Sequence, residues 1–526
     1  MKVTIHKLFE YLLETAGEEP PECVLGFSLS QSPTLGDFLP DLSPDLVLDW
    51  NGVSFQGLPA LRERVIAQAG LAGLCSPEDV LITAGAAEAN YLCFRQLLAP
   101  GDEIVTETPG WPQAAVMARG IGADLRLVKR REENGWRLDL DELAAAVTAK
   151  TKLIFLSNPN NPTGQLLTEA ELHRIAAIAD KVGAWLIVDE VYAGLEWEGA
   201  RAPSIAGIYP RGITTGSVSK GLGLQGLRTG WLICRDRQMV MDAVILRENS
   251  SEIMNILGEH IAEIALRPDR LGPALVRARA AGAATLAQLD AFIAGQPQLS
   301  WVRPQAGLIG LARLKGEGAE PFARRLLAAP YRTFLLPGTA YDEPAHIRLG
   351  VGGGAAVRLE AADLRPGEVR LGFGPGEAEL YLSASGDLVE AAANLFHMLR
   401  EADRLAQGRV IAVAPVPEAG LGRAINDRLR RAAVYDQDGL ACENPRNRDV
   451  ERDRRPRSTN GARKRAYPQA FRPNPVEHLH WTAPPHECNT PKSAPASSTR
   501  FTDYPDPAGF RPIIPRPPTV RPQAHS

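Results

Sequence analysis

The stretch SVSKGLGLQGLRTGW, Ser217 to Trp231, combines side chains that could do chemistry at short spacing. It carries one amine, Lys220, and one guanidinium, Arg228, eight residues apart among glycines and hydroxyls. A lysine of this kind can form a Schiff base with a carbonyl compound, and hydroxyls with a guanidinium can hold a phosphate. Because K-x-x-G is also common in solvated surface loops, this chemistry needs partners elsewhere: an acid, a phenol, an amide and a flat aromatic.

An acid, a phenol and an amide lie upstream, at or just after predicted strands. Asp189 ends the apolar run from Trp185 to Val188, where an unpaired carboxylate would be costly, so a buried partner is implied. Tyr192 follows three residues later. The stretch NPNNPTG, with Asn161 inside it, directly follows the strand KLIFLS. Asn161 therefore lies at the carboxyl end of a strand, where open α/β sheets bind ligands.

Small residues and a tryptophan follow two further strands. Gly85 and Ala86 turn the chain from the strand Val80 to Thr83 into a helix, and small residues there let backbone N–H groups approach an anion. Many α/β folds turn this way for packing alone. Trp111 follows the strand Glu103 to Glu107 and could belong to the core or offer a flat face to a ring.

Short apolar strands alternate with amphipathic helices along the first 300 residues. The patterns predict helices over 7–15, 55–70, 139–147, 168–183, 237–266 and 270–293, and strands over 80–83, 103–107, 124–129, 153–156, 185–188 and 231–235. This alternation predicts an α/β fold whose mostly parallel sheet is covered by helices on both faces.

Composition limits the classes of protein to consider. The chain has 526 residues, enough for two or three domains, and its net charge of -4 gives no overall attraction to nucleic acid or anionic membrane. Its six cysteines include no C-x-x-C pair, which favours reduced thiols and a cytoplasmic location. No apolar run approaches about 18 residues and the start does not read as a signal peptide, so we expect no membrane span.

The end of the chain differs from the rest. From Glu443 to Ser526 it carries 15 Lys and Arg against 8 Asp and Glu, and it holds 16 of the 42 prolines. Such a segment cannot bury enough apolar surface to offset its ordering entropy, so we expect a disordered basic, Pro-rich tail over 437–526. The tail could contact nucleic acid weakly, or it could be a solvated extension or an artefact of the reading frame.

Taken in order, Asn161 in NPTG, Asp189 and Tyr192 in DEVY, and Lys220 and Arg228 closely resemble class I/II aminotransferases of pyridoxal-phosphate fold type I. The resemblance covers about residues 20–354. It implies a homodimer that moves an amino group from an amino acid to a 2-oxo acid, with Lys220 holding pyridoxal 5'-phosphate as a Schiff base and shuttling the Cα proton. A lyase or cyclase that uses the same cofactor shares these residues and stays open.

The resemblance also implies a role for each remaining residue. Asp189 would pair with the pyridinium nitrogen, Tyr192 and Asn161 would hydrogen-bond O3′, and Trp111 would stack on the ring. Arg348, in HIRLGVG, would hold the substrate's α-carboxylate, with Asn161 beside it. The phosphate would be bound by Gly85, Ala86, Ser217, Ser219 and Arg228.

Beyond residue 354 the family's closing helix is missing, and a second resemblance begins. LSASGDLVEAAANLF and VPEAGLGRAINDRLRRAA resemble the C-terminal domain of threonylcarbamoyladenylate synthases, and the segment predicts a small βαβα layer. That family's catalytic domain, which binds ATP and threonine, has no counterpart here, so no active site is carried over. A protein related to tRNA threonylcarbamoylation, or an inactive binding protein, is the alternative of another class.

The two resemblances together predict five regions. Residues 1–35 would be the N-terminal part of a small domain, 36–266 the large cofactor-binding domain, 267–354 the rest of the small domain, 355–436 the synthase-like domain and 437–526 the tail. One departure concerns the family's tyrosine that binds the neighbouring subunit's phosphate. Gly52 stands in its place, with Trp50 as an imperfect substitute.

Overall fold

The computed structural model describes residues 4–15, 21, 23–49, 54–328, 331–352, 357–358, 364, 367–406 and 409–432. Every described residue belongs to the unit Met1–Leu440. The predictions for Trp50, Gly52 and the tail therefore lie outside the described residues.

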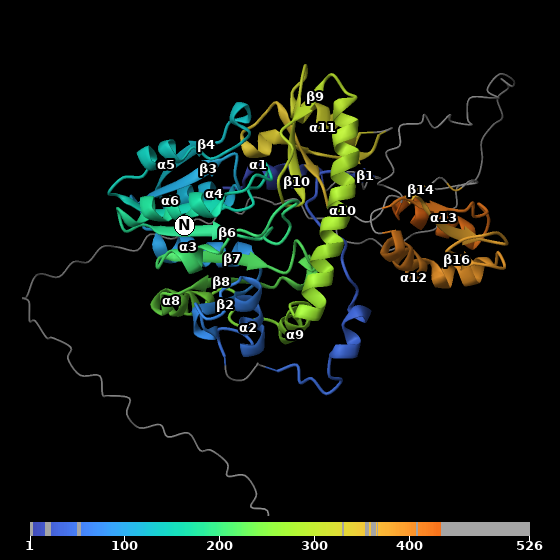
Figure 1. Cartoon of the computed structure of the whole chain (residues 1–526), viewed down its shortest axis with the longest axis horizontal. Coiled ribbons are helices and arrows are strands. Elements are labelled where there is room, and N and C mark those ends of the chain that lie inside the picture. Colours follow the sequence, from blue (N-terminus) through green and yellow to red (C-terminus); the bar gives the residue numbers. More distant parts are fainter. Residues whose placement is uncertain are drawn as a thin grey trace, which may run out of the picture. The chain divides into compact units, whose positions relative to one another are not determined.

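A seven-stranded sheet with the order β2-β8-β7-β6-β5-β3-β4 forms the centre of the main body (Figure 1). Its strands are β2 (Val80–Thr83), β3 (Glu103–Thr108), β4 (Asp124–Lys129), β5 (Thr151–Ser157), β6 (Trp185–Asp189), β7 (Gly212–Ser217) and β8 (Gly230–Cys234). The strands from β4 to β7 pair in parallel, and β8 runs antiparallel to both of its neighbours. The predicted α/β fold with a mostly parallel sheet is confirmed.

Helices cover both faces of this sheet, as the alternating side chains of β5 illustrate. Leu153 and Phe155 pack in a core cluster with residues of α3, α4 and α8, whereas Ile154 and Leu156 pack in another with residues of α5, α6 and α7. The helices of the main body are α2 (Pro59–Gln68), α3 (Ala86–Leu97), α4 (Gln113–Ile121), α5 (Leu140–Ala146), α6 (Glu169–Asp180), α7 (Ile205–Ile208), α8 (Arg237–Arg247), α9 (Ile256–Ala265) and α10 (Pro268–Ala294).

Two predicted helices differ from the observed ones. The helix expected over 55–70 begins only at Pro59, because proline is well suited to the first helical turn. The single helical region expected over 237–266 is two helices, and the Asn255 side chain begins the second by accepting a hydrogen bond from the Gly258 N–H. The helix expected over 270–293 is the 27-residue α10, which begins two residues earlier, at Pro268.

A second sheet with the order β12-β13-β10-β9 carries Arg348 in β13. Its strands are β9 (Leu299–Trp301), β10 (Ile309–Leu314), β12 (Leu336–Pro337) and β13 (His346–Gly350), and a separate pair joins β1 (Cys23–Val24) to β11 (Thr333–Phe334). Residues of α1 (Lys7–Thr15), α10 and α11 (Ala319–Leu327) share one core cluster with this sheet. The N-terminal segment therefore packs with strands more than 300 residues later.

The synthase-like region has a sheet and an apolar core of its own. A parallel sheet with the order β14-β17-β15-β16 packs with α12 and α13 around its own apolar core. Its elements are β14 (Val357–Arg358), β15 (Val369–Phe373), β16 (Leu380–Ser383), α12 (Leu388–Ala406), β17 (Ile411–Val413) and α13 (Leu421–Ala432). The prediction of a two-stranded βαβα layer was wrong in strand number, because β14 has only two residues and β15 lies among glycines and charged residues that weaken its apolar pattern.

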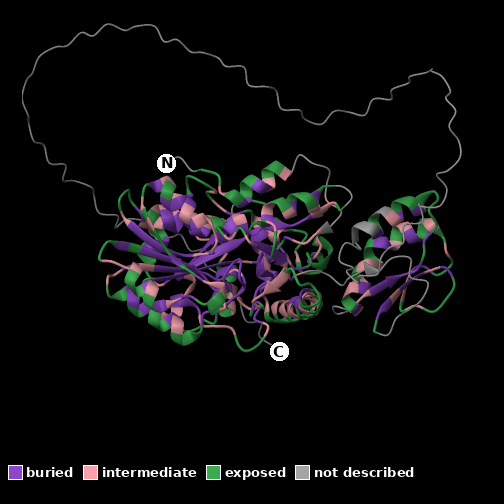
Figure 2. Cartoon of the chain, turned by 90° about the horizontal axis from the view of Figure 1, so that it is seen from above, coloured by how far each residue is buried: buried purple, intermediate pink, exposed green. Residues whose placement is uncertain are grey.

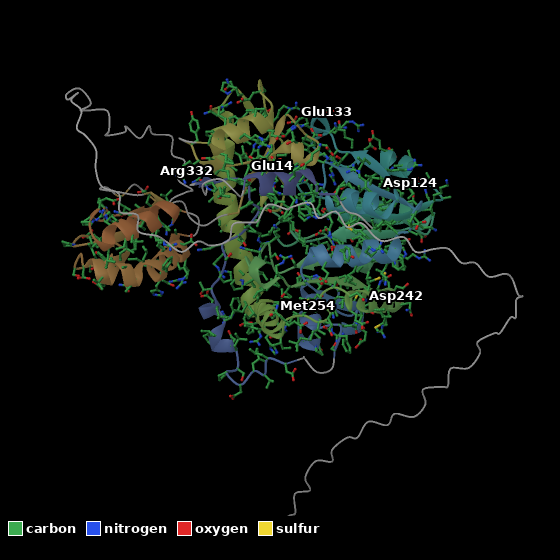
Figure 3. All side chains as sticks on the ribbon, turned by 180° about the vertical axis from the view of Figure 1, so that it is seen from behind. Glu14, Asp124, Glu133, Asp242, Met254 and Arg332 are labelled. Carbon is green, nitrogen blue, oxygen red and sulfur yellow. The ribbon has the colours of Figure 1, made fainter. Side chains whose placement is uncertain are left out.

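Burial follows the layers. Figure 2 shows most strands of the main sheet buried between helices with exposed outer faces, whereas Val128 is the only buried residue of the edge strand β4. Charged side chains such as Asp124 and Glu133 lie on the outside (Figure 3). Among the described helices, none is long and apolar enough to cross a membrane.

Candidate active site

The predicted site residues gather at one edge of the main sheet, where parallel strands end together. Ser157 at the end of β5 lies directly opposite Asp189 at the end of β6, and Asp189 lies opposite Thr215 near the end of β7. Lys220 follows β7 by three residues. Because these three strands are neighbours and parallel, their carboxyl ends bring residues far apart in sequence to one place.

Asp189 is a buried carboxylate held by neutral donors. Its Oδ2 accepts a hydrogen bond from Asn90 Nδ2 at 2.9 Å, and its Oδ1 accepts one from the Val191 N–H at 3.2 Å. The Thr215 hydroxyl fixes the Asn90 amide by donating to its Oδ1 at 2.8 Å. Burial raises the pKa of Asp189 to about 6, and the two hydrogen bonds oppose that rise. The buried partner expected from the sequence is therefore Asn90, which is fully buried in α3.

Lys220 points its amine at the N-terminal segment. Nζ donates to the main-chain oxygen of Ser28 at 3.2 Å and to the Ser28 hydroxyl at 3.0 Å, and it lies 5.7 Å from the centre of the Tyr192 ring. The Tyr192 hydroxyl donates to the same Ser28 Oγ at 2.8 Å. Burial, together with the charges of Arg348 and Arg228, lowers the pKa of Lys220 to about 8, whereas the charge of Asp189 acts in the opposite direction.

Arg348 is a buried guanidinium with an unused donor. Nη1 donates to the Tyr341 hydroxyl at 2.6 Å and to Asn161 Oδ1 at 3.3 Å, and Nη2 donates to the Gly26 carbonyl at 2.7 Å. The buried Nε has no hydrogen-bond partner. Three of the five N–H donors are thus occupied, and the remaining ones could bind an anion such as a carboxylate.

The residues predicted to bind phosphate surround the start of α3. Gly85, with φ +83°, precedes the helix, and the Arg228 guanidinium lies so close that a Cβ at Gly85 would sit 2.5 Å from Nη2. Ser219 is buried and Ser217 half-buried at the end of β7, and the Ser219 N–H donates to Ser217 Oγ at 3.3 Å. A helix N-terminus beside hydroxyls and a guanidinium is a suitable place for a phosphate. Ala86 is the first residue of that helix.

Trp111 and Asn161 lie at the same edge, with different contacts. Trp111 is half-buried, and its indole N–H donates to Gln113 Oε1 at 3.3 Å. The His6 ring packs edge-on against it, with the ring centres 6.2 Å apart. Asn161 is buried and contacts Arg348, as described above, so the structure brings the amide predicted for cofactor and substrate together with the predicted carboxylate grip.

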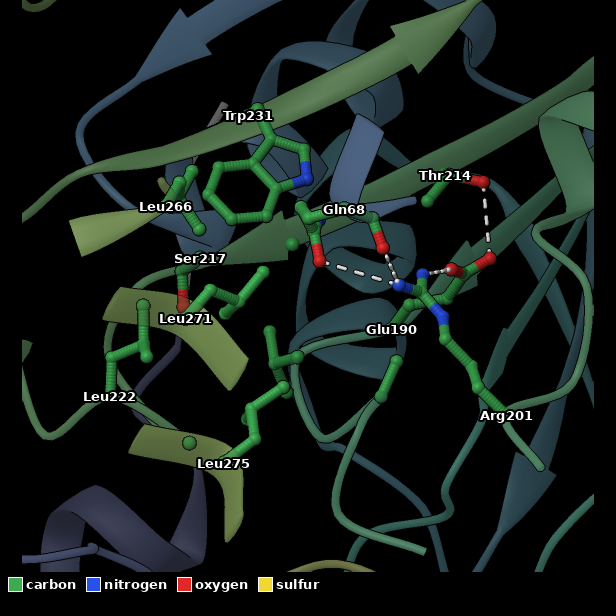
Figure 4. Close-up of a pocket in the computed structure, with 14 residues that line it drawn as sticks. Gln68, Glu190, Arg201, Thr214, Ser217, Leu222, Trp231, Leu266, Leu271 and Leu275 are labelled. Atoms are coloured by element: carbon green, nitrogen blue, oxygen red, sulfur yellow. Dashed lines mark hydrogen bonds and ion pairs between the residues drawn. The ribbon is translucent and has the colours of Figure 1, made fainter. Parts of the chain in front are cut away.

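A small cavity lies beside the Lys220 loop and is lined in part by Ser217, Gly221 and Leu222. Its volume is about 30 Å³, room for roughly one water molecule, and Figure 4 shows it between Ser217 and Trp231 on one side and the ion pair of Glu190 with Arg201 on the other. Leucines such as Leu275 close it. It is a packing defect beside the site, too small for a substrate.

Sequence reasoning missed Asn90, Ser28 and Tyr341. Asn90 had a detectable signal, because a polar residue on the inner face of a helix after a glycine turn faces the sheet edge. Ser28 lies in an irregular segment and Tyr341 ends the 3-10 helix Gly338–Tyr341, and no local pattern in either place predicts a contact with a residue 192 or 7 positions away.

Comparisons with known proteins agree with this geometry. The model of "Aminotransferase class I and II" matches residues 51–363, and that of "Threonylcarbamoyl-AMP synthase, C-terminal domain" matches residues 349–434. An aspartate aminotransferase of Musicola paradisiaca is 29% identical over 314 residues, which are 58% of this chain and 77% of that protein.

Solved structures give the same result. A PLP-dependent aminotransferase from Streptococcus suis superposes with a TM-score of 0.61 at 27% identity, over 67% of this chain and 93% of that one. The PLP-dependent cyclase OrfR superposes with a TM-score of 0.59 at 25% identity, over 67% and 94%. With its family model matched over more than half of its length, this chain belongs to the class I and II aminotransferases, and a threonylcarbamoyl-AMP synthase C-terminal domain follows in the same chain.

Proposed function

We propose that this protein is a pyridoxal-phosphate-dependent aminotransferase that moves an amino group from an amino acid to a 2-oxo acid. The grouping of Lys220, Asp189 and Arg348 carries the proposal. It combines an amine of lowered pKa, a buried carboxylate with neutral partners, and a buried guanidinium whose Nε is unused. Each group is costly to bury alone, and each matches one charged part of the cofactor or substrate.

The residues present fit pyridoxal phosphate. Within the described part of the chain, no Lys or Arg nitrogen forms an ion pair with Asp189, so its carboxylate is free to bind a protonated ring nitrogen. At the other end, Arg228, the α3 N-terminus and the serines at 217 and 219 would hold the phosphate, and only a glycine at 85 leaves room there. Tyr192 and Asn161 would contact the ring oxygen, with Trp111 against the ring face.

When bound, pyridoxal phosphate would withdraw electrons from the substrate's α-carbon and make its proton acidic. Lys220 Nζ would take that proton, and a pKa of about 8 leaves a useful fraction of free amine near neutral pH. Asp189 would keep a proton on the ring nitrogen. Arg348 would bind the α-carboxylate of the amino acid and, in the second half-reaction, that of the 2-oxo acid.

The test is covalent attachment followed by amino transfer. Purified protein incubated with pyridoxal phosphate and reduced with borohydride should carry the pyridoxyl group on the peptide that contains Lys220, as read by mass spectrometry. Lys220→Ala should lose the label and the activity, whereas Lys152→Ala, which changes an exposed lysine of β5, should keep both. Protein that binds no cofactor would refute the proposal and favour the alternative of a binding protein or a tRNA-threonylcarbamoylation component.

A second candidate is a lyase or cyclase acting on an amino acid, which the likeness to the cyclase OrfR supports. The two reactions differ in the fate of the amine. An aminotransferase converts the bound cofactor to pyridoxamine phosphate and passes the amine to an added 2-oxo acid. Release of ammonia or of a cyclised product, without pyridoxamine phosphate accumulating, would identify the second reaction.

A homodimer is the assembly we propose. Large apolar side chains stay exposed in the segment that precedes α2, each more than half accessible, namely Leu35, Leu39, Val47, Leu48 and Phe55. Such a concentration on one segment marks a protein-contact surface. Light scattering on the purified chain should give twice the subunit mass of 56.8 kDa, and a monomer at micromolar concentration would contradict the assembly.

A further inference from the structure

The Ser28 side chain lies between two residues of the candidate site and belongs to neither of their elements. Its hydroxyl oxygen accepts hydrogen bonds from Tyr192 at 2.8 Å and from Lys220 Nζ at 3.0 Å, and its main-chain oxygen accepts a second bond from Nζ at 3.2 Å. Ser28 is only 4% exposed, so water does not compete for these bonds. Both lone pairs of the hydroxyl are therefore used by site residues.

The segment that carries Ser28 is held on both sides. Toward β13, a Cβ at Gly350 would lie 2.1 Å from the Phe27 carbonyl oxygen, and one at Gly352 would lie 2.4 Å from that of Leu29. These glycines let β13 and the residues after it approach the segment's backbone closely. Ser28, between the two contacts, has little freedom to move away.

The other side of the segment is fixed to the Lys220 loop. The Ser30 hydroxyl donates to the Lys220 main-chain oxygen at 2.5 Å, and a Cβ at Gly223 would lie 2.1 Å from the Gln31 carbonyl oxygen. The lysine backbone and the segment are thus one packed unit. In this unit Ser30 binds the backbone of Lys220, whereas Ser28 accepts two hydrogen bonds from its amine.

We propose that Ser28 is a positioning residue that holds the free amine of Lys220 beside Tyr192 and favours its protonated form. This rests on the proposed function, because the amine must be free, near the substrate and able to exchange a proton whenever it is not bonded to the cofactor. An amine on a flexible four-carbon stem would otherwise sample many positions, and proton transfer is slow from positions in which the amine is not aligned with the substrate. Ser28 replaces that freedom with one location.

The charges around the amine define what Ser28 adds. Arg348 and Arg228 oppose a proton on Lys220, and Asp189 favours one. Tyr192 is neutral near pH 7, since burial raises the pKa of its hydroxyl. Ser28 supplies two neutral acceptors in this balance, one of which an alanine would remove. Losing an acceptor destabilises the ammonium more than the amine, so the pKa of Lys220 should fall.

The test uses the full chain freed of cofactor and labels amines with acetic anhydride as a function of pH. The label on the Lys220 peptide, quantified by mass spectrometry, gives the pKa of that one lysine. Ser28→Ala should lower it by about one unit, which is a tenfold change in the ammonium-to-amine ratio at fixed pH. Ser28→Cys keeps the volume but offers a weak acceptor, so it should shift the pKa in the same direction if the alanine variant fails to fold.

Two neighbouring serines provide matched controls. Ser30→Ala removes the bond to the Lys220 backbone, and Ser32→Ala removes an exposed hydroxyl on the same segment that forms a hydrogen bond with Gln225. Neither should change the pKa of Lys220. With cofactor bound, Ser28→Ala should reduce kcat about tenfold or more and leave KM for the amino acid nearly unchanged, because the carboxylate is held elsewhere.

The possible results separate the two proposals. The inference is wrong if Ser28→Ala leaves the pKa of Lys220 unchanged, or if the Ser30 and Ser32 variants shift that pKa equally. Either result overturns it even if the protein has aminotransferase activity. A titration that depends on Ser28 in a protein without amino-transfer activity supports the positioning role and refutes only the proposed reaction.

Discussion

Because Asp189 is buried, we expect its negative charge to make the cofactor-free protein less stable. The carboxylate is 5% exposed, and its partners, Asn90 and the Val191 N–H, are neutral. Replacing it by the isosteric amide in Asp189→Asn removes the charge and keeps the shape. We expect this variant to lose amino-transfer activity and, without cofactor, to be more stable than the wild type above pH 6.

The magnitude follows from the pKa of the carboxyl group. Burial raises it from 3.8 to about 6, a difference of roughly two units, and each unit corresponds to about 1.36 kcal/mol. Because the folded-state pKa lies above the unfolded value, the folded protein binds the proton more tightly. The stabilisation from protonated Asp189 is complete below about pH 4 and is lost as the pH rises through 6. At pH 8 the charge therefore costs the folded state about 3 kcal/mol.

Urea unfolding of cofactor-free protein between pH 4 and pH 8 measures this cost. The difference in free energy of unfolding between Asp189→Asn and the wild type should be small near pH 4 and grow to about 2–3 kcal/mol by pH 8. Asp124→Asn changes an exposed acid at the start of β4 and is the matched control. A difference that is constant with pH, or that shrinks as the pH rises, would refute the reasoning.

Three further predictions concern other parts of the site and core. Gly85→Ala should weaken cofactor binding at least tenfold in a spectroscopic titration, because it adds a clash 2.5 Å from a guanidinium nitrogen. Gly101 has a similarly positive φ, +84°, but lies in open space, so Gly101→Ala should leave affinity unchanged. Arg348→Lys should lower kcat/KM for the amino acid about 10- to 100-fold in steady-state assays, since a point charge cannot replace a fork of donors. In the wild type the Glu107 carboxylate lies 2.7 Å from the fully buried Arg130 guanidinium. Glu107→Gln removes this counter-charge and should lower the free energy of unfolding, measured in urea, by about 3–5 kcal/mol.

The sequence predicted the main body well where one periodicity controls the structure. The strand Val80–Thr83, the strand Asp124–Lys129 and the helix Lys7–Thr15 have the predicted bounds, because each is a short apolar run or an amphipathic repeat between turn residues. The helical region 237–266 was divided wrongly. The interruption follows the polar stretch 248–252, and the cap at Asn255, a residue type favoured at helix starts, is a local sign that the prediction did not use.

The candidate site was predictable only to the extent that its residues follow strands. Asp189 lies at the end of an apolar run, and its position at the sheet edge follows from that pattern alone. Ser28 and Tyr341 are different. Ser28 contacts Lys220, 192 residues away, from an irregular segment, and Tyr341 contacts Arg348, 7 residues away, from the end of a 3-10 helix. Tertiary packing sets both contacts. Arg348 also donates a hydrogen bond to the Gly26 carbonyl, and a contact with a main-chain oxygen cannot be predicted from a pattern of side chains.

The matches to the two families overlap directly after the last residue of the candidate site. Arg348 lies in β13, and the match to the synthase domain begins one residue later, at 349. The two matches overlap over residues 349–363, and this overlap includes Gly350 and Gly352, the glycines that clamp the Ser28 segment. All residues that we assign to cofactor or substrate precede the overlap. A change of sequence after Gly352 therefore affects neither β13, which carries Arg348, nor the glycines that contact the Ser28 segment. We expect the chemistry at Lys220 not to depend on the synthase-like domain.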